Sequence, residues 1–106
     1  MMYITSPSIA GKKITKTHGL VRGNAVRARH LGRDILAGLK NIVGGEIEEY
    51  TKLLAESRQQ AIDRMLEDAQ TMGANAVVDV RFATSLIANM AAEIMSYGTA
   101  VTVEDA

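Results

Sequence analysis

The residues from Glu46 to Met72 keep an uninterrupted helical period, and glycines stand on both sides of this segment. Its apolar residues recur at spacings that place them along one side of an α-helix. The main stripe is Ile47, Tyr50, Leu54 and Ala61, and beside it lie Leu53, Ile62, Met65, Ala69 and Met72. Gly73 then ends the helix. A helix of this length must bury its stripe against a sheet, so the rest of the chain is expected to supply one.

A shorter helical pattern comes just before it, in GRDILAGLKNIVGG, residues 32–45. Ile35, Leu39 and Ile42 stand at positions i, i+4 and i+7, which predicts a short amphipathic helix. Gly44 is placed where a helix often needs a left-handed residue to close.

The pair Gly44-Gly45 has two readings. Free backbone N–H groups at the start of the next helix could hold an anion. However, the first turn of that helix carries three carboxylates, Glu46, Glu48 and Glu49. These carboxylates already complement the helix dipole and would repel a phosphate. No Lys-Ser or Lys-Thr pair follows the glycines, so the motif is not a P-loop. We therefore interpret the junction as a corner between two helices.

Both ends of the chain have strand character. MYIT, residues 2–5, is short, and residues 12–28 read as one long kinked strand or two consecutive ones. Gly19 and Gly23 interrupt that second stretch, as at bulges or bends. In NAVVDVRFATSLI, residues 75–87, alternation predicts a half-buried strand with Val78, Val80, Phe82 and Leu86 on one face.

A last strand is predicted in AAEIMSYGTAVTV, residues 91–103. One of its faces carries small residues, Ser96, Gly98, Ala100 and Thr102, which suits the close approach of a helix or a neighbouring subunit. The predicted fold is a single α+β domain over residues 1–106. It has an antiparallel sheet with a short and a long helix packed on it, in the order β-β-α-α-β-β.

Composition narrows the functional class. The 106 residues include no cysteine, which excludes disulfides and thiolate chemistry and is typical of a reducing compartment. No apolar run is long enough for a signal peptide or a membrane span, so a cytoplasmic protein with no membrane partner is expected. The net charge is zero, but residues 1–45 carry +7 and residues 46–106 carry −7. Such asymmetry favours either a nucleic-acid partner or attraction between the two halves.

Metal and nucleic-acid sites find little support in the sequence. Ligand clusters of Asp and Glu are absent, and the two histidines, His18 and His30, lie twelve positions apart, so no metal site is expected within one chain. A basic strip could contact phosphates; it consists of Lys12, Lys13, Lys16, Arg22, Arg27 and Arg29. Tyr3 is the one aromatic residue in the first 45, so stacking groups are missing from the strip and nucleic acid is an unlikely partner.

Polar residues on the helices suggest a ligand site. Arg33-Asp34 opens the short helix, and Tyr50, Ser57 and Arg58 share one side of the long one. These groups could bind a small ligand at a cleft. The other reading makes Tyr50 a core residue and pairs Arg58 with an acid.

Several stretches together resemble one known family. They are TSPSIAGKKI, GLVRGNAV, GRDILAGLKNIVGGEIEEYTKLLAESRQQA, GANAVV and SYGTAV, and they span nearly the whole chain. On these stretches the sequence resembles the YbjQ-like family, small bacterial proteins labelled "putative heavy-metal-binding domain". The resemblance implies an α+β subunit of a ring oligomer, a pentamer, and a metal ion through the label alone. It places family positions on Arg33, Asp34, Tyr50 and Arg58, whereas Glu46 stands where the family often has arginine.

Two functional classes follow. The favoured one is a non-enzymatic oligomeric binding or structural protein that holds a small ligand or a metal ion between subunits. The alternative is an enzyme of unknown reaction with a site completed across the subunit interface by Arg33, Asp34, Tyr50 and Arg58. No catalytic residue and no cofactor is identified from the residues themselves.

Overall fold

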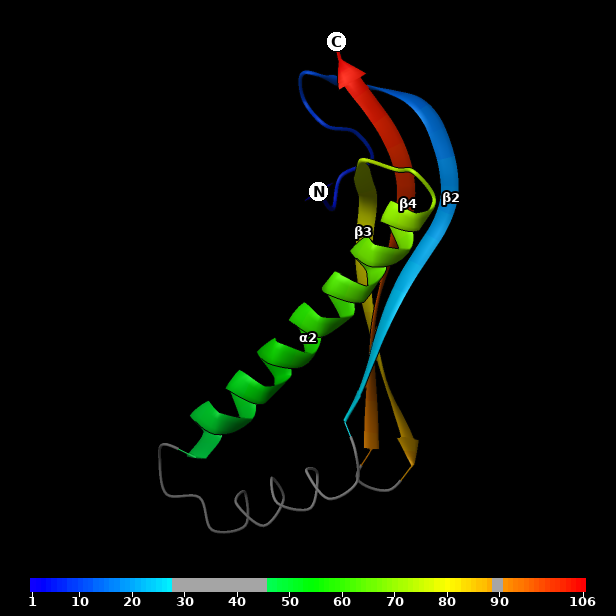
Figure 1. The fold of residues 1–106 in the computed structure, drawn as a ribbon. Coiled ribbons are helices and arrows are strands. Elements are labelled where there is room, and N and C mark those ends of the chain that lie inside the picture. The colour runs from blue at the N-terminus through cyan, green and yellow to red at the C-terminus, as the bar shows by residue number, and fades with distance from the viewer. Residues whose placement is uncertain (28–45, 89–90) are drawn as a thin grey trace.

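The computed structural model of the chain describes residues 1–27, 46–88 and 91–106, in which it places four strands and a long helix (Figure 1). The elements are β1 (Met2–Tyr3), β2 (Lys12–Arg27), α2 (Glu46–Thr71), β3 (Ala76–Ala88) and β4 (Ala91–Asp105). The long helix and the strands thus lie where the sequence predicts them. The short helix predicted in residues 32–45 falls outside the described residues.

The sheet is mixed, so the prediction of a purely antiparallel sheet was wrong. Its strand order is β1-β3-β4-β2. β4 pairs antiparallel with both β3 and β2, but β1 pairs parallel with β3. A tight hairpin forces antiparallel pairing, whereas a long connection allows parallel pairing. β2 and α2 both lie between β1 and β3 in the chain, so that pair is free of the hairpin constraint.

The two glycines of β2 have different roles. The register with β4 shifts between Ile14 and Lys16 and again between Thr17 and Gly19, where Gly19 has a φ of 125°. The bulge predicted at Gly19 is therefore confirmed. Gly23 instead pairs regularly with Ser96, so the bend predicted there was wrong. Its missing side chain serves the helix contact, because a Cβ at this position would lie 2.1 Å from the carbonyl oxygen of Ala61.

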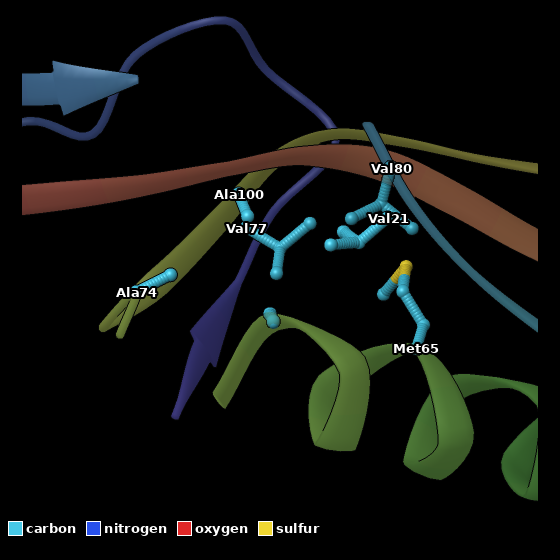
Figure 2. Close-up of a cluster of buried hydrophobic side chains, with 7 residues drawn as sticks. Val21, Met65, Ala74, Val77, Val80 and Ala100 are labelled. Carbon is cyan, nitrogen blue, oxygen red and sulfur yellow. The ribbon is translucent and has the colours of Figure 1, made fainter. Parts of the chain in front are cut away.

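One face of the sheet is covered by α2, which crosses β2 and β4 (Figure 1). Met65 is fully buried at the centre of this contact and points towards Val21 and Val80 (Figure 2). The small-residue face of β4 lies here, since Ser96, Gly98 and Ala100 are all buried. The expected close approach of a helix to that face is thus made by α2 of the same chain. Met72, which the sequence placed beside the stripe, is 41% exposed at the end of the helix.

A bulge in β3 divides its valines between the two faces of the sheet. Asp79 has a left-handed φ of 54°, and the register with β4 shifts between Val78 and Arg81. Val80 consequently packs in the core under α2, whereas Val78 packs on the opposite face. The alternation predicted for this strand was therefore wrong, because one extra residue reverses the side of every later one.

The face opposite α2 is covered over part of its length. Ile4 and Ile9 of the N-terminal segment pack there against Ala76, Val78 and Val101. Backbone bonds tie the segment to the bulge, since the N–H of Asp79 donates to Ser6 and the N–H of Val80 donates to Ile4. Beyond the N-terminal segment, side chains from three strands lie on this face, and no described residue covers them. We call this area the open face; its residues are Leu20, Arg22, Asn24 and Val26 of β2, Arg81, Ala83 and Ser85 of β3, and Glu93, Met95, Tyr97 and Thr99 of β4.

Candidate functional site

Of the four residues of the predicted ligand site, only Arg58 has a side chain that the structure describes. Arg33 and Asp34 lie outside the described residues, as does the side chain of Tyr50. Arg58 is exposed on α2. Its neighbour Ser57 is fully buried and donates a hydrogen bond of 2.9 Å to the carbonyl of Leu53. The two polar groups therefore face different surroundings, and the site stays a prediction.

The buried hydroxyls under α2 belong to the packing between helix and sheet. The bond from Ser57 to Leu53 spans one helical turn, which is a common way for a serine within a helix to satisfy its hydroxyl. Ser96 on β4 donates to the sulfur of Met65 at 3.2 Å. Every buried side-chain nitrogen and oxygen in the described residues has a hydrogen-bond partner. This interior is consistent with a packed core and offers no polar group aimed at a ligand.

The described residues do not form a set of metal ligands. His18 lies with its Nε2 2.7 Å from Oγ1 of Thr102, and His30 is outside the described ranges. No group of three or more His, Asp or Glu side chains gathers within residues 1–27, 46–88 and 91–106. Soft metals prefer thiolates and imidazoles, and the chain has no cysteine. The metal-donor side chains of the described residues therefore do not fit a heavy-metal site within one chain.

We predict weak metal binding on this basis. Titration of the metal-free protein with Zn²⁺ or Cu²⁺ should show no stoichiometric site tighter than about micromolar, because single histidines without thiolates hold these ions poorly. Isothermal calorimetry measures the affinity directly. The control is the double variant His18→Ala/His30→Ala. A nanomolar site that survives both replacements would contradict the prediction.

The open face carries a row of three residues that the sequence did not single out together. Arg22 pairs with Tyr97, and Tyr97 pairs with Arg81, so the three lie side by side across β2, β4 and β3. Side chains of directly paired residues share one face of a sheet. Tyr97 thus lies between two arginines on one face of the sheet. We call these residues the Arg–Tyr–Arg row.

The two arginines of the row are held differently. Arg81 donates from Nη1 to the carbonyl of Thr5 at 2.7 Å and to that of Val80 at 2.9 Å. Its Nη2 is 4.0 Å from the carboxylate of Asp79, which is the outer limit of an ion pair. Arg22 is exposed, and within the described residues no hydrogen bond or ion pair involves its guanidinium or the hydroxyl of Tyr97. The row therefore offers one fixed and one free cation on the two strands that flank Tyr97.

Local patterns could not reveal this row, because its residues come from three strands. The basic strip includes Arg22, but its missing aromatic residue is supplied from β4. The partner Arg81 follows Asp79, whose bulge determines which residue faces Tyr97. Predicting the row would have required the register of β2, β4 and β3, including the bulge at Asp79.

None of the helices in the part of the chain described combines the length and apolarity needed to span a membrane.

Comparison with known proteins gives a consistent result. Residues 1–104 match a family model described as "YbjQ_1: Putative heavy-metal-binding". A UPF0145 protein from Methanosarcina acetivorans is 56% identical over 103 residues, covering 97% of each chain. Another from Pyrococcus furiosus is 54% identical over 104 residues, covering 98% of this chain and 91% of its own. A third, from Hahella chejuensis, is 55% identical over 104 residues, covering 98% of this chain and 100% of its own.

The fold has a counterpart among solved structures. A crystal structure of a protein with unknown function from Pediococcus pentosaceus superposes with a TM-score of 0.66 and covers 98% of both chains at 13% identity. At that identity the likeness concerns the fold alone. Relatives from archaea correct the description of the family as bacterial. The match over residues 1–104 and relatives of about 55% identity establish that the chain belongs to the YbjQ-like family of UPF0145 proteins.

Proposed function

We propose that this protein is a non-enzymatic, cytoplasmic binding or structural protein whose subunits assemble into a closed ring, a pentamer, with a small ligand or metal ion held between copies. The observation that carries the proposal is the pair of strand edges, one at each side of the sheet, beside which no strand of the described residues lies. A long, flat strand edge with apolar side chains is a template for pairing with another chain.

The first edge belongs to β2, which ends the strand order. Its first half, Lys12–Gly19, carries three lysines and both register shifts. Lysines and bulges are the means by which natural proteins protect an edge from pairing. Its second half keeps a regular register from Leu20 to Arg27, and there Leu20 and Val26 are 63% and 51% exposed. Only this second half has the character of a pairing edge.

The second edge belongs to β3. β1 pairs with Ala76 and Val77, and the N-terminal segment reaches no further than Val80. From Arg81 onwards no described strand lies beside β3 on that side. Phe82 is 46% exposed on this stretch. β2 and β3 run in the same direction because both are antiparallel to β4. The β2 edge of one copy can thus meet the β3 edge of the next, and such head-to-tail contacts close into rings.

The charges of the two halves stay largely separate in the described residues. Lys12 pairs with Asp105, where the hydrogen bond from the lysine and then its charge lower the pKa of that exposed carboxyl. The other described ion pair, Arg81 with Asp79, lies within the acidic half. Lys13, Lys16 and Arg22 have no acidic partner in the described part. Unneutralised charge of this kind supports electrostatic attraction between copies.

Native mass spectrometry of protein purified without added metal tests the proposal. We expect a single closed assembly of five copies and a retained mass that corresponds to the bound ligand. A monomer over the whole accessible range of protein concentration would contradict the assembly. An assembly with no retained mass would contradict the binding role.

Salt should slow assembly without dissolving the ring. Opposite charges steer encounter but add little affinity, whereas apolar burial supplies most of the binding free energy. Raising the salt from about 20 mM to about 500 mM shrinks the Debye length from roughly 20 Å to about 4 Å. Stopped-flow reassembly should therefore be slower at the higher salt, while native mass spectrometry should show an unchanged subunit count. A reassembly rate that is indifferent to salt would mean that the basic half faces something other than a second copy.

A further inference from the structure

We propose that the open face binds single-stranded nucleic acid, with one base stacked on Tyr97 and the neighbouring phosphates at Arg22 and Arg81. The inference does not depend on ring assembly, although Leu20 and Val26 at the margin of this face also lie on the β2 edge that the proposed ring would use. Neither the family description nor the names of the relatives assigns such a site.

The geometry of the row fits this ligand. Neighbouring strands lie about 4.8 Å apart, so the Cα atoms of Arg22 and Arg81 are about 10 Å apart with Tyr97 midway between them. Proteins that hold single strands without sequence preference combine cationic groups along the backbone with aromatic rings on which the bases stack. The row places one ring and two cations in that arrangement, on the side of the sheet away from the acidic residues of α2.

The chemical groups of the row are available for a ligand. The free guanidinium of Arg22 can turn towards a phosphate because it forms no bond within the described residues. Arg81 is anchored at Nη1 by the carbonyls of Thr5 and Val80, which positions its remaining donors at little cost in side-chain entropy. The separation of 4.0 Å from Asp79, with both side chains about half exposed, leaves that ion pair weak.

The surroundings limit the site to a few nucleotides. Thr99 and Leu20 lie on one side of the row, and beyond them the N-terminal segment covers the sheet. On the other side come Asn24 and Met95, and then the carboxylate of Glu93, which pairs with Val26 and Ser85. Glu93 would repel a longer strand in that direction. The site is therefore a short, polar and cationic stretch with an aromatic centre.

A second copy of this chain fits the face less well. Arg22 has no acidic partner in the described residues, and a contact between copies that buried its guanidinium without an acid from the other copy would be costly. Duplex nucleic acid fits poorly too, because its bases are already stacked and cannot cover a tyrosine ring. The two exposed arginines together with the half-buried ring of Tyr97 favour a single strand.

Fluorescence anisotropy with a labelled oligothymidylate of about a dozen nucleotides tests the proposal. We expect saturable binding at low salt, with a slope of log K against log salt of about −1.4 for two phosphate contacts. Arg22→Gln should reduce that slope by about 0.7. Tyr97→Leu should weaken binding about tenfold, as for the loss of one stacked base, whereas Tyr97→Phe should retain it. Lys52→Ala removes an exposed cation from α2 and should leave the affinity and the slope unchanged.

Each remaining outcome overturns the proposal. Absence of binding at low salt would do so. Equal affinity for a heparin fragment, or an affinity that Tyr97→Leu does not change, would show general attraction for polyanions instead of a stacking site. A change in subunit count for Tyr97→Leu, measured by native mass spectrometry, would show that the face is a contact between copies. Should Tyr97→Leu fail to fold, Arg22→Gln decides, because this exposed residue has no packing role among the described residues.

Discussion

Replacing Gly23 by alanine is expected to lower the free energy of unfolding by at least about 3 kcal/mol, the upper end of the usual cost of overpacking. The Cβ atom would lie 2.1 Å from the carbonyl oxygen of Ala61 and 2.3 Å from the backbone nitrogen of Met65. Both are backbone atoms of α2, so neither can move aside by rotating a side chain. The helix would have to shift off β2, and the burial of Met65 and Ala61 would be reduced with it.

Urea unfolding at a fixed protein concentration measures this effect, since assembly makes apparent stability depend on concentration. Gly73→Ala is the matched control. A Cβ there meets nothing within 4 Å, and only the φ of 86° disfavours alanine, so a loss of about 1 kcal/mol is expected. If Gly23→Ala costs no more than Gly73→Ala, then α2 does not pack against β2 as closely as the distances require.

Gly19 and Gly23 also show why sequence alone reaches only part of this fold. Both interrupt the β pattern of residues 12–28, and both were expected to mark bends. Gly19 does, with its positive φ at a register shift. Gly23 lies in a regular stretch and is required by an element that follows it by some 38 residues, as the contact with Ala61 shows. The local sequence shows that both positions are glycine. It does not show whether the glycine is required by a positive φ or by a close contact with the helix.

Asp79 is the reverse case, a bulge that no glycine in the sequence indicates. The alternation of residues 75–87 correctly predicted a strand, and nothing at Asp79 indicates a left-handed conformation beyond its tolerance for one. The bulge is stabilised by partners remote in sequence, the carbonyls of Ile4 and Ser6. Because it reverses the faces of the strand, it also determines that Arg81 lies beside Tyr97. The Arg–Tyr–Arg row therefore depends on the N-terminal segment and could not be assembled from periodicity.

Long periodic segments were the predictable part. The helix of residues 46–72 is confirmed as α2, and Gly73 ends it with a φ of 86° and a bond from its N–H to Gln70. Its stripe was predicted because 3.6-residue periodicity is a local property. The ligand site of Arg33, Asp34, Tyr50 and Arg58 was predicted from polar residues on the two helices and from family positions, and Arg58 is the one member whose side chain the structure describes. The site stays a prediction.

Lysine at the second half of the β2 edge is expected to break the proposed ring into monomers. Leu20 and Val26 are more than half exposed in the subunit, and each would lose roughly half of the burial free energy of its side chain if the edge could not pair. The double variant Leu20→Lys/Val26→Lys should thus weaken each contact between copies by about 2–3 kcal/mol. That corresponds to a dissociation constant about 30- to 150-fold higher for each contact. Native mass spectrometry and light scattering should report monomers for this variant and the proposed ring for the parent protein.

Ile14, in the first half of the same strand, provides the control for the double variant. Ile14 is 41% exposed, but it lies among lysines and beside a register shift, where the edge is already protected. Ile14→Lys should therefore leave the subunit count unchanged, and neither variant should lower the stability of the isolated subunit by more than about 0.5 kcal/mol. If the double variant still forms the ring, copies meet elsewhere than at β2.

The same variant also adds two cations next to Arg22, so binding of the labelled single strand should strengthen as the ring dissociates. Loss of both properties together would mean that assembly and the open face are one surface.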